Sequence, residues 1–340
     1  GYNHAVTMGR SRNVWGPYEP DPIGAIVTSQ PEESNERADP DHLKPKYFNP
    51  QSVLQKSGHG SYVDLPNGET YLVHLTARPF VPELRCTLGR ETAIQKMHWT
   101  EDGWLRMADG SNLAKLEVEE PDLPDVPMPR IPSHDDFDAP ELGNWYYSPR
   151  IMPTSFADVT ARPGWVRLRG QESLASLNRV SLLTRKLTSV QATVTTRMEF
   201  TPEVYQHSAG LVLYYDNMNN AFLRKYWSET LGGPAISIVR LENGEKTEML
   251  DTRTAVDNRP ICMRLNISGR RSWFEWGYDG ETWTKIGPEF DATTFSDEYC
   301  KFGEFTGTMV GIAVTDAALH EKTADFDFFD YEADESAPVE

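Results

Sequence analysis

The sequence predicts an all-β protein, built from antiparallel strands in two domains. Apolar and polar residues alternate with period two along many short segments, and the 3.6-residue period of long amphipathic helices is nearly absent. Four Asn-Gly or Asp-Gly dipeptides separate such segments, at positions 67–68, 102–103, 243–244 and 279–280. These dipeptides favour two-residue type I′ hairpins, because both central residues can adopt positive φ. Together they indicate antiparallel β-sheets.

The first predicted domain covers residues 1–117. Two of the hairpins lie here, in VDLPNGETYLVHL (63–75) and WTEDGWLRM (99–107). A polar, proline-bounded segment at 30–50 is predicted to form a long loop. The domain offers only about four to six strands, which by itself is an incomplete architecture.

The segment at 118–132 is predicted to be a linker. It is rich in acidic residues and prolines, and proline removes backbone donors and favours an extended chain. The second predicted domain follows at 133–340. It contains at least eight short apolar segments, several with one apolar face, of which SVQATVTTRMEF (189–200) and SAGLVLYYD (208–216) are examples. So many short strands predict two packed sheets, a β-sandwich.

Composition excludes several classes of partner. The formal net charge of -18 argues against nucleic acid, because binding to phosphates needs a basic surface. No run of about 18 apolar residues is present, so no membrane partner is expected. Three widely spaced cysteines (Cys86, Cys262 and Cys300) form neither a metal-binding nor a disulfide pattern. This favours a cytoplasmic over a secreted location.

Two sets of longer motifs carry the most specific information. The first set is YNHAVTMGRSRNVWGPYE (2–19), QKSGHGSYVD (55–64), GETYLVHLTARP (68–79) and LGRETAIQKMHWTEDGWLR (88–106). The second is DDFDAPELGNWYYSPRI (135–151), RPGWVRLRGQESLASL (162–177), AGLVLYYDNMNNAFL (209–223), DGETWTKIGPEFDATTFSDEY (279–299) and ADFDFFDYEA (324–333). The first resembles the last blades of the five-bladed β-propeller of glycoside hydrolase family 43, in its β-xylosidase branch. The second resembles that branch's C-terminal concanavalin-like β-sandwich.

The resemblance implies a partial five-bladed β-propeller followed by a concanavalin-like antiparallel β-sandwich. It also implies a portion of an exo-acting inverting β-xylosidase, which hydrolyses terminal xylose from xylooligosaccharides; some relatives release L-arabinofuranose as well. In the family the general acid, general base and modulating carboxylate all lie in earlier blades, upstream of Gly1. We therefore expect no catalytic residue in this chain, and no activity without the missing N-terminal propeller segment as partner.

The chain's own carboxylates do not change this expectation. Asp and Glu number 51, so acidic pairs are common and carry little information. The acidic runs at 32–41 and 117–125 are predicted to be solvated loop and linker. Asp325, Asp327 and Asp330 are predicted near the outer face of a strand. None of these groups forms a credible catalytic pair.

His59 is the first candidate site residue. It lies between Gly58 and Gly60, which allow close approach of the backbone, at the start of a strand. By the resemblance, this histidine lines the floor of a sugar-binding pocket, and in some relatives it contacts a calcium ion directly or through water. Calcium prefers oxygen ligands, so other groups would be needed. The resemblance requires no cofactor, and calcium is the one metal it suggests. A purely structural histidine in a turn is the alternative.

Arg90 and Phe305 are the other candidates. The guanidinium of Arg90 presents fixed paired donors that suit vicinal sugar hydroxyls; the alternative is a structural ion pair with Glu91. Arg78 is predicted to be structural. The resemblance places a sandwich loop at the mouth of the pocket, and Phe305 is its candidate for stacking on a sugar, with core packing as the alternative.

Two other functions stay open. A non-catalytic carbohydrate-binding sandwich would show a row of exposed aromatic residues on one sheet face, for which Trp273, Trp276 and Trp283 are available. An inactive truncated product is the third interpretation. A homo-oligomer also stays open, because the sequence does not determine the oligomeric state.

Overall fold

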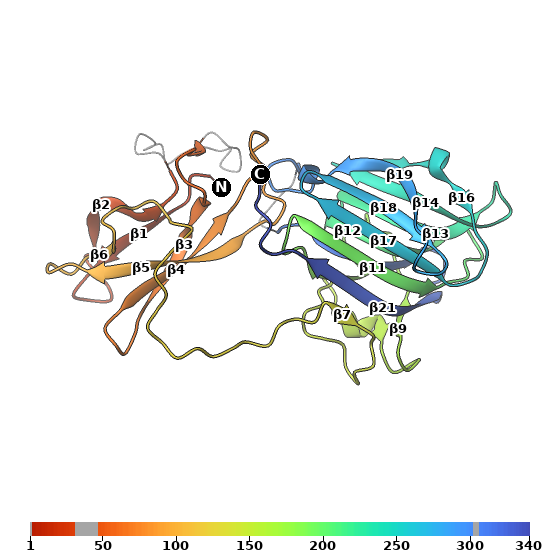
Figure 1. Ribbon diagram of the computed structural model, residues 1–340, viewed down its shortest axis with the longest axis horizontal. Helices are drawn as coiled ribbons and strands as arrows, with labels where there is room; N and C mark the ends of the chain where they lie inside the picture. Colours follow the sequence, from red (N-terminus) through yellow and green to blue (C-terminus); the bar gives the residue numbers. More distant parts are fainter. Residues whose placement is uncertain (1, 31–46, 302–305) are drawn as a thin grey trace. The chain divides into compact units, whose positions relative to one another are not determined.

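The computed structural model describes residues 2–30, 47–301 and 306–340. The chain divides into two compact units, unit 1 (Gly1–Met128) and unit 2 (Pro129–Glu340), and the boundary falls inside the segment 118–132. Both units consist of β-strands, and the described residues include three short 3-10 turns but no α-helix (Figure 1). Consequently, this part of the chain has no helix long and apolar enough to cross a membrane.

Unit 1 contains two small antiparallel sheets (Figure 1). One sheet pairs β1 (Ala5–Arg10) with β2 (Glu19–Thr28). The other has the order β3 (Gln55–Asp64), β4 (Thr70–Ala77), β5 (Glu91–Trp99) and β6 (Leu105–Met107). Both sheets contribute to one small core, with Val27 of β2, Leu72 of β4 and Leu105 of β6 among its buried members.

Unit 2 contains two large antiparallel sheets. The seven-stranded sheet has the order β10 (Ser181–Lys186), β20 (Met309–Asp316), β12 (His207–Asp216), β13 (Asn219–Ser228), β14 (Gly233–Glu242) and β15 (Glu245–Glu248), and β16 (Thr254–Ala255) also pairs with β14. The eight-stranded sheet has the order β19 (Thr284–Asp291), β18 (Arg271–Gly277), β17 (Ile261–Ser268), β11 (Gln191–Glu199), β21 (Thr323–Ala333), β9 (Val166–Arg169) and β8 (Ala157–Asp158), and β7 (His134–Asp135) pairs with β21. The 3-10 turns are η2 (Pro153–Ser155), η3 (Leu250–Thr252) and η4 (Ala292–Thr294).

The two sheets of unit 2 pack face to face as a sandwich. They meet through β12 against β17 and β14 against β19. Along β11, buried residues alternate strictly with less buried ones, as the period-two pattern predicts for a strand with one core face. Phe274 of β18 and Phe326 and Phe329 of β21 are fully buried. The sandwich thus has its own hydrophobic core.

All four predicted hairpin dipeptides lie between paired strands or strand segments, but the type I′ prediction is wrong for three. Only Asn243-Gly244 has positive φ at both residues (48° and 89°). At the others only the glycine has positive φ. The reason is local: Asn67 Oδ1 accepts the backbone N–H of Glu69, and Asp279 Oδ1 accepts that of Glu281. These side chains stabilise longer turns in which the non-glycine residue keeps negative φ.

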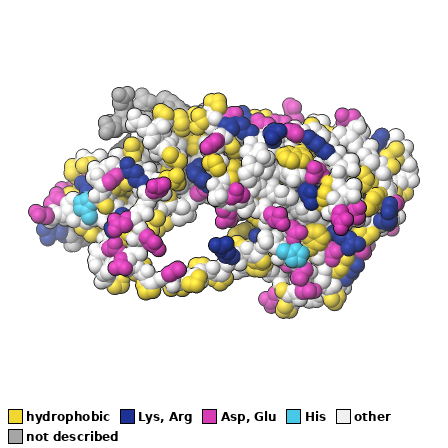
Figure 2. Space-filling view, in the orientation of Figure 1, with side chains coloured by type: hydrophobic (Ala, Val, Ile, Leu, Met, Phe, Trp, Pro, Cys, Tyr) yellow, Lys and Arg dark blue, Asp and Glu magenta, His cyan; other side chains and the backbone are white. Residues whose placement is uncertain are grey.

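All three cysteines are buried thiols. Burial raises the pKa of Cys262, and it raises the pKa of Cys300 to about 12. On the face drawn in Figure 2, Lys and Arg side chains are interspersed with Asp and Glu, and no continuous basic surface is visible there.

Candidate functional site

His59 lies in an irregular part of β3. The register of β3 against β4 shifts between Gln55 and Gly58 and again between Gly58 and Ser61. Lys56 and His59 both have positive φ, at 56° and 54°, which is uncommon for residues other than glycine. The strand is buried up to Gly58 and exposed from His59 onward. The backbone therefore presents the His59 side chain at the surface of unit 1, where the strand emerges from the core.

The glycines on either side of His59 allow β1 and β4 to approach closely. A Cβ atom at Gly58 would lie 2.8 Å from Cβ of His4, just before β1. A Cβ atom at Gly60 would lie 2.8 Å from Leu72 Cδ2 and 2.9 Å from Val6 Cγ2. Neither position accommodates a side chain without displacement of its neighbour. The Gly-His-Gly motif is thus explained by packing, and it places His4 beside the turn that carries His59.

His4 is a site residue that sequence reasoning missed. Its carbonyl accepts a hydrogen bond from Thr28 Oγ1 at 2.9 Å, while its ring atom Nδ1 is buried without a hydrogen-bond partner. Burial and, to a lesser degree, nearby groups that include Arg90 and His59 lower the pKa of His4 to about 4. The ring is therefore neutral at neutral pH. His4 lies against Gly58, next to His59, and Arg90 is near enough to influence the pKa of His4, so we call His4, His59 and Arg90 the His–Arg cluster.

Glu91 is the ion-pair partner considered for Arg90 in the alternative interpretation. Glu91 pairs with Arg78, whose Nε and Nη2 atoms contact its two carboxylate oxygens at 3.1 and 2.8 Å. This bidentate pair confirms the structural interpretation of Arg78. Arg90 is half-buried, directly before β5. The cluster thus combines a guanidinium, which donates hydrogen bonds, with imidazole rings, which can donate and accept them, and both kinds of group suit sugar hydroxyls.

The calcium prediction for His59 stays a prediction. Within residues 2–30, 47–301 and 306–340, no three His, Cys, Asp or Glu side chains are grouped closely enough to hold a metal ion. Calcium takes six to eight oxygen ligands, and the His–Arg cluster consists of nitrogen donors. The described residues alone do not fit this ion, so we derive no function through it.

Phe305, the predicted stacking residue, lies outside the described residues. Two acidic residues of β21 form ion pairs: Asp325 contacts Arg167 at 2.6 Å, and Asp327 contacts Arg197 at 3.1 Å. These contacts keep the carboxylates paired with cations, as expected for ion pairs on the outside of a sheet.

The three tryptophans proposed as a binding row do not share one face. Trp273 lies across from Asn266 on the outer face of the eight-stranded sheet, and Trp276 lies across from the buried Met263, on the opposite face. Arg264 covers the ring of Trp283 at 3.8 Å. The described residues therefore lack the aromatic row that this alternative required of them.

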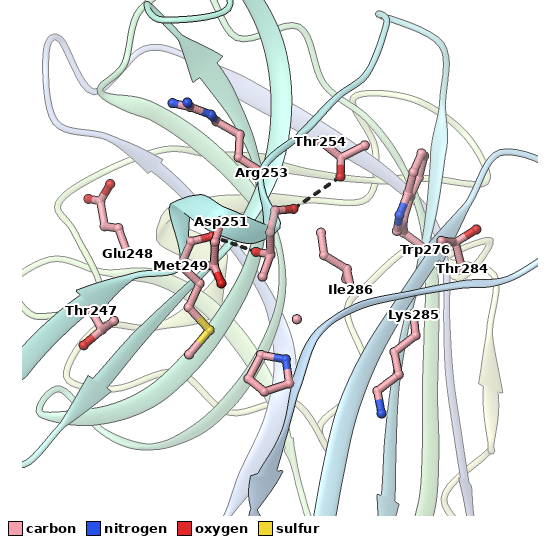
Figure 3. A pocket seen from close by; sticks show the side chains of 13 residues that line it. Thr247, Glu248, Met249, Asp251, Arg253, Thr254, Trp276, Thr284, Lys285 and Ile286 are labelled. Carbon is pink, nitrogen blue, oxygen red and sulfur yellow. Dashed lines mark hydrogen bonds between the residues drawn. The ribbon is translucent and has the colours of Figure 1, made fainter.

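Trp276 instead lines a cavity of about 720 Å³ at one edge of the sandwich, which we call the edge cavity. Trp276, Thr284 and Ile286 stand on one side of it, and residues of η3 stand on the other (Figure 3). The hydroxyls of Thr252 and Thr254 both donate to backbone carbonyls. These polar groups are already satisfied, so they give no indication of a missing ligand.

Comparison with known proteins agrees with this geometry. Residues 1–105 match the model of glycosyl hydrolases family 43. Residues 134–332 match that of the β-xylosidase C-terminal concanavalin A-like domain. The expected fold, a partial five-bladed propeller followed by a concanavalin-like sandwich, is confirmed by these matches and by the solved structures below.

Three relatives illustrate the similarity. A xylan 1,3-β-xylosidase from a Vibrio species is 33% identical, and the alignment covers 97% of this chain and 60% of the relative. A xylosidase/arabinosidase 43B from Humicola insolens is 35% identical, with 97% and 59% covered. The crystal structure of xylan β-1,4-xylosidase from Bacillus halodurans C-125 is 41% identical, with a TM-score of 0.88 and 97% and 60% covered.

The chain therefore spans about 60% of the length of these relatives, and both of its units are included in the match. The family models together cover most of the chain, and the sandwich model alone covers more than half of it. The protein belongs to glycosyl hydrolase family 43.

Proposed function

We propose that this chain is the portion of an exo-acting inverting β-xylosidase that contains the last propeller blades and the sandwich. The observation that carries the proposal is the extent of the similarity, which runs through both units to proteins named as xylosidases. In this proposal the enzyme hydrolyses terminal xylose from xylooligosaccharides. The predictions of a cytoplasmic location and of a homo-oligomer stay predictions.

Within that enzyme the His–Arg cluster would bind sugar rather than carry out the proton transfers. Inversion needs a protonated acid and an ionised base about 6.5–9.5 Å apart, with a water molecule between the base and the sugar. The cluster contains three basic residues, and the pKa of about 4 for His4 makes this ring a poor proton carrier at neutral pH. Arg90 and His59 would instead hold the hydroxyls of the terminal sugar, with His4 behind them. The acid and base would come from strands preceding Gly1.

The exposed face of the four-stranded sheet supports the need for such strands. Val63, Val73 and Ile94 lie on neighbouring strands of one face, and each is 37–47% exposed. A propeller blade normally buries both faces against its neighbours. We propose that this face packs against the preceding blade of the complete enzyme.

L-Arabinofuranosides are proposed as a second class of substrate. One relative carries the name xylosidase/arabinosidase, and another, from Bacteroides ovatus, is named a non-reducing end α-L-arabinofuranosidase. The latter is 27% identical to this chain. Comparing nitrophenyl xyloside with nitrophenyl arabinofuranoside as substrates would determine the preference.

The test is a reconstitution assay. The purified 340-residue chain is assayed on nitrophenyl xyloside, with and without the separately produced upstream propeller segment. We expect no turnover by the chain alone and clear turnover by the mixture, because acid and base catalysis each contribute about 10²- to 10⁴-fold. Turnover by the chain alone would contradict the proposal.

Arg90→Ala in the reconstituted enzyme tests the role of the cluster. It should lower kcat/KM by about 30-fold, or about 2 kcal/mol, because sugar hydroxyls lose a charged donor. Arg10→Ala is the matched control, since the guanidinium of Arg10 is engaged by Glu19 and by the ring of Trp104. Equal effects of both substitutions would count against a sugar contact by Arg90.

A further inference from the structure

A second cavity, of about 350 Å³, lies on the outer face of the seven-stranded sheet. The face is identified by Ile238 of β14, which approaches Gly287 of the opposite sheet so closely that a Cβ atom there would lie 2.5 Å from Ile238 Cδ1. The next residue, Val239, and its cross-strand neighbour Phe222 therefore point away from the sandwich interior. We call this cavity the outer-face cavity.

Alternate residues of β13 line it: Asn220, Phe222, Arg224 and Tyr226. Side chains on one face of a strand repeat every second residue, so these four form a continuous row about 20 Å long. This is an extended site on a rigid central strand, in contrast to the His–Arg cluster at the irregular end of β3.

Three polar atoms in this row are buried without any hydrogen-bond partner. They are Asn220 Oδ1, Arg224 Nε and the hydroxyl of Tyr226. The residues themselves are well buried, with Asn220 fully inaccessible and Tyr226 6% exposed. Leaving a buried polar group unpaired costs about 1–3 kcal/mol, so such groups are rare in native proteins and require an explanation. Because all three line one cavity, a ligand that supplies the partners is the simplest explanation.

The charged side chains of the cavity, Arg224, Lys246 and Glu248, contact one another. Arg224 Nη2 donates to Glu248 Oε2 at 3.3 Å, and the guanidinium lies over the ring of Tyr226 at 4.2 Å. Glu248 Oε1 also accepts from Lys246 at 2.6 Å. The unpaired atoms are therefore an amide oxygen, a guanidinium N–H and a hydroxyl. They call for neutral groups that both donate and accept hydrogen bonds.

The cavity also has an apolar surface that suits a sugar ring. The buried rings of Phe222 and Tyr226 and the side chain of Leu174 line the cavity, and Tyr205, 59% exposed, stands among the lining residues as an accessible aromatic ring. A sugar offers hydroxyls that donate and accept around its edge and apolar C–H groups on its faces, which stack on aromatic rings. The volume falls in the range of about 300–1,000 Å³ that small-molecule sites occupy.

We propose that the outer-face cavity binds a neutral sugar without cleaving it. The ligand class follows from the cavity itself, whereas the choice of a xylooligosaccharide as its occupant rests on the proposed function. The sandwich would then hold a glycan at a site of its own, separate from the His–Arg cluster. Contact with a longer xylan chain would raise the local concentration of chain ends near the enzyme.

Tyr226→Phe tests the proposal in the full 340-residue chain, by calorimetric titration with xylobiose, cellobiose and glucuronic acid. We expect xylobiose to bind about fivefold more weakly to the variant, because one hydrogen bond to the sugar is lost. The variant should also melt at an equal or higher temperature without ligand, because an unpaired buried hydroxyl has been removed. A hydroxyl with only a structural role would not give both results.

Tyr146→Phe is the matched control, since the hydroxyl of Tyr146 is also buried and unpaired but does not line the cavity. It should change melting and leave binding unchanged. Tyr205→Ala, at an exposed position, provides a second variant that should weaken binding without any effect on folding.

The outcomes separate this proposal from the proposed function. Binding of cellobiose but not xylobiose, weakened by Tyr226→Phe, would support a neutral-sugar site and contradict its occupation by xylooligosaccharides. Failure of the reconstitution assay leaves this result unaffected. The proposal is overturned if neither neutral sugar binds, if glucuronic acid alone binds, or if binding is the same in wild type, Tyr226→Phe and Tyr205→Ala.

Discussion

The two units differ in how their sheets are covered. In unit 2 each sheet has the other as a partner, and aromatic residues such as Phe274 and Phe326 are fully buried between them. In unit 1 the four-stranded sheet covers a small core with one face, while Val63 and Ile94 on the other face remain exposed. Both units follow the same period-two pattern. A regular strand pattern therefore does not by itself show that a sheet is covered by residues of its own chain.

Producing the two units as separate fragments tests this difference most directly. We expect residues 129–340 to unfold cooperatively with a β-type circular dichroism spectrum, because the sandwich contains a complete core. Residues 1–128 should show no cooperative transition, because one face of the larger sheet stays in water.

The measurement is urea unfolding of each fragment, followed by circular dichroism and tryptophan fluorescence. A molten or mainly helical product from 129–340 would show that the sandwich is not self-sufficient. A cooperative transition of 1–128 alone would show that unit 1 is complete as it stands, and would remove the reason to seek a covering blade.

A second test concerns the buried carboxylate of Asp316 at the end of β20. One oxygen accepts the backbone N–H groups of Ala318 and Leu319, at 2.9 and 3.1 Å. The other accepts those of Glu321 and Lys322, at 2.8 and 2.9 Å. Asp316→Asn should lower the free energy of unfolding of the sandwich by about 3 kcal/mol, because buried donors lose a charged acceptor.

The pH dependence of unfolding should change with it. Burial raises the pKa of Asp316, but the four backbone donors outweigh this and hold the pKa far below its ordinary value of 3.8. The carboxylate therefore stabilises the fold above pH 3.8, and this contribution is lost as the pH falls below that value. The wild type should lose sandwich stability in acid more steeply than Asp316→Asn. Asp158→Asn, at the exposed end of β8, is the control and should cause a much smaller loss.

A smaller change is predicted for the pKa of one side chain in unit 1, the imidazole ring of His4. In the full chain, the pKa of His4 measured by NMR should be about 4, and Arg90→Gln should raise it towards 6.5, because a nearby positive charge is removed. Since the fold favours neutral His4, the stability of unit 1 should fall as the pH drops from 6.5 towards 4.

Arg10→Gln is the control and should leave the pKa of His4 unchanged. An unchanged pKa in Arg90→Gln would show that Arg90 and His4 are not neighbours, and the His–Arg cluster would be wrong. A pKa near 6.5 in the wild type would mean that His4 is not buried, and unit 1 would then be less ordered than its strands indicate.

The sequence predicted the architecture well because strand alternation and glycine turns are local signals. Asn243-Gly244 adopts the expected turn, since both residues tolerate positive φ. Asn67 and Asp279 do not, because their side chains accept backbone N–H groups and stabilise a different turn. The position of a hairpin was therefore predictable, but the geometry of its loop was not.

The sites were less predictable because they depend on contacts between distant strands. His59 was recognisable from its flanking glycines, but nothing near residue 4 indicates that His4 lies against Gly58. Likewise, the alternation along β13 identifies one face of a strand. The alternation does not reveal that Arg224 Nε and the Tyr226 hydroxyl lack partners, because this depends on side chains from the strands around β13.

The buried thiols give the molecule a set of internal reporters. Cys86 belongs to unit 1, while Cys262 and Cys300 belong to unit 2. The raised pKa values of the latter two keep them as unreactive thiols while the sandwich is closed. An alkylating reagent would therefore modify each cysteine only when its surroundings open. Mass spectrometry of the modified peptides would then record the opening of each unit separately, within a single sample of the natural protein.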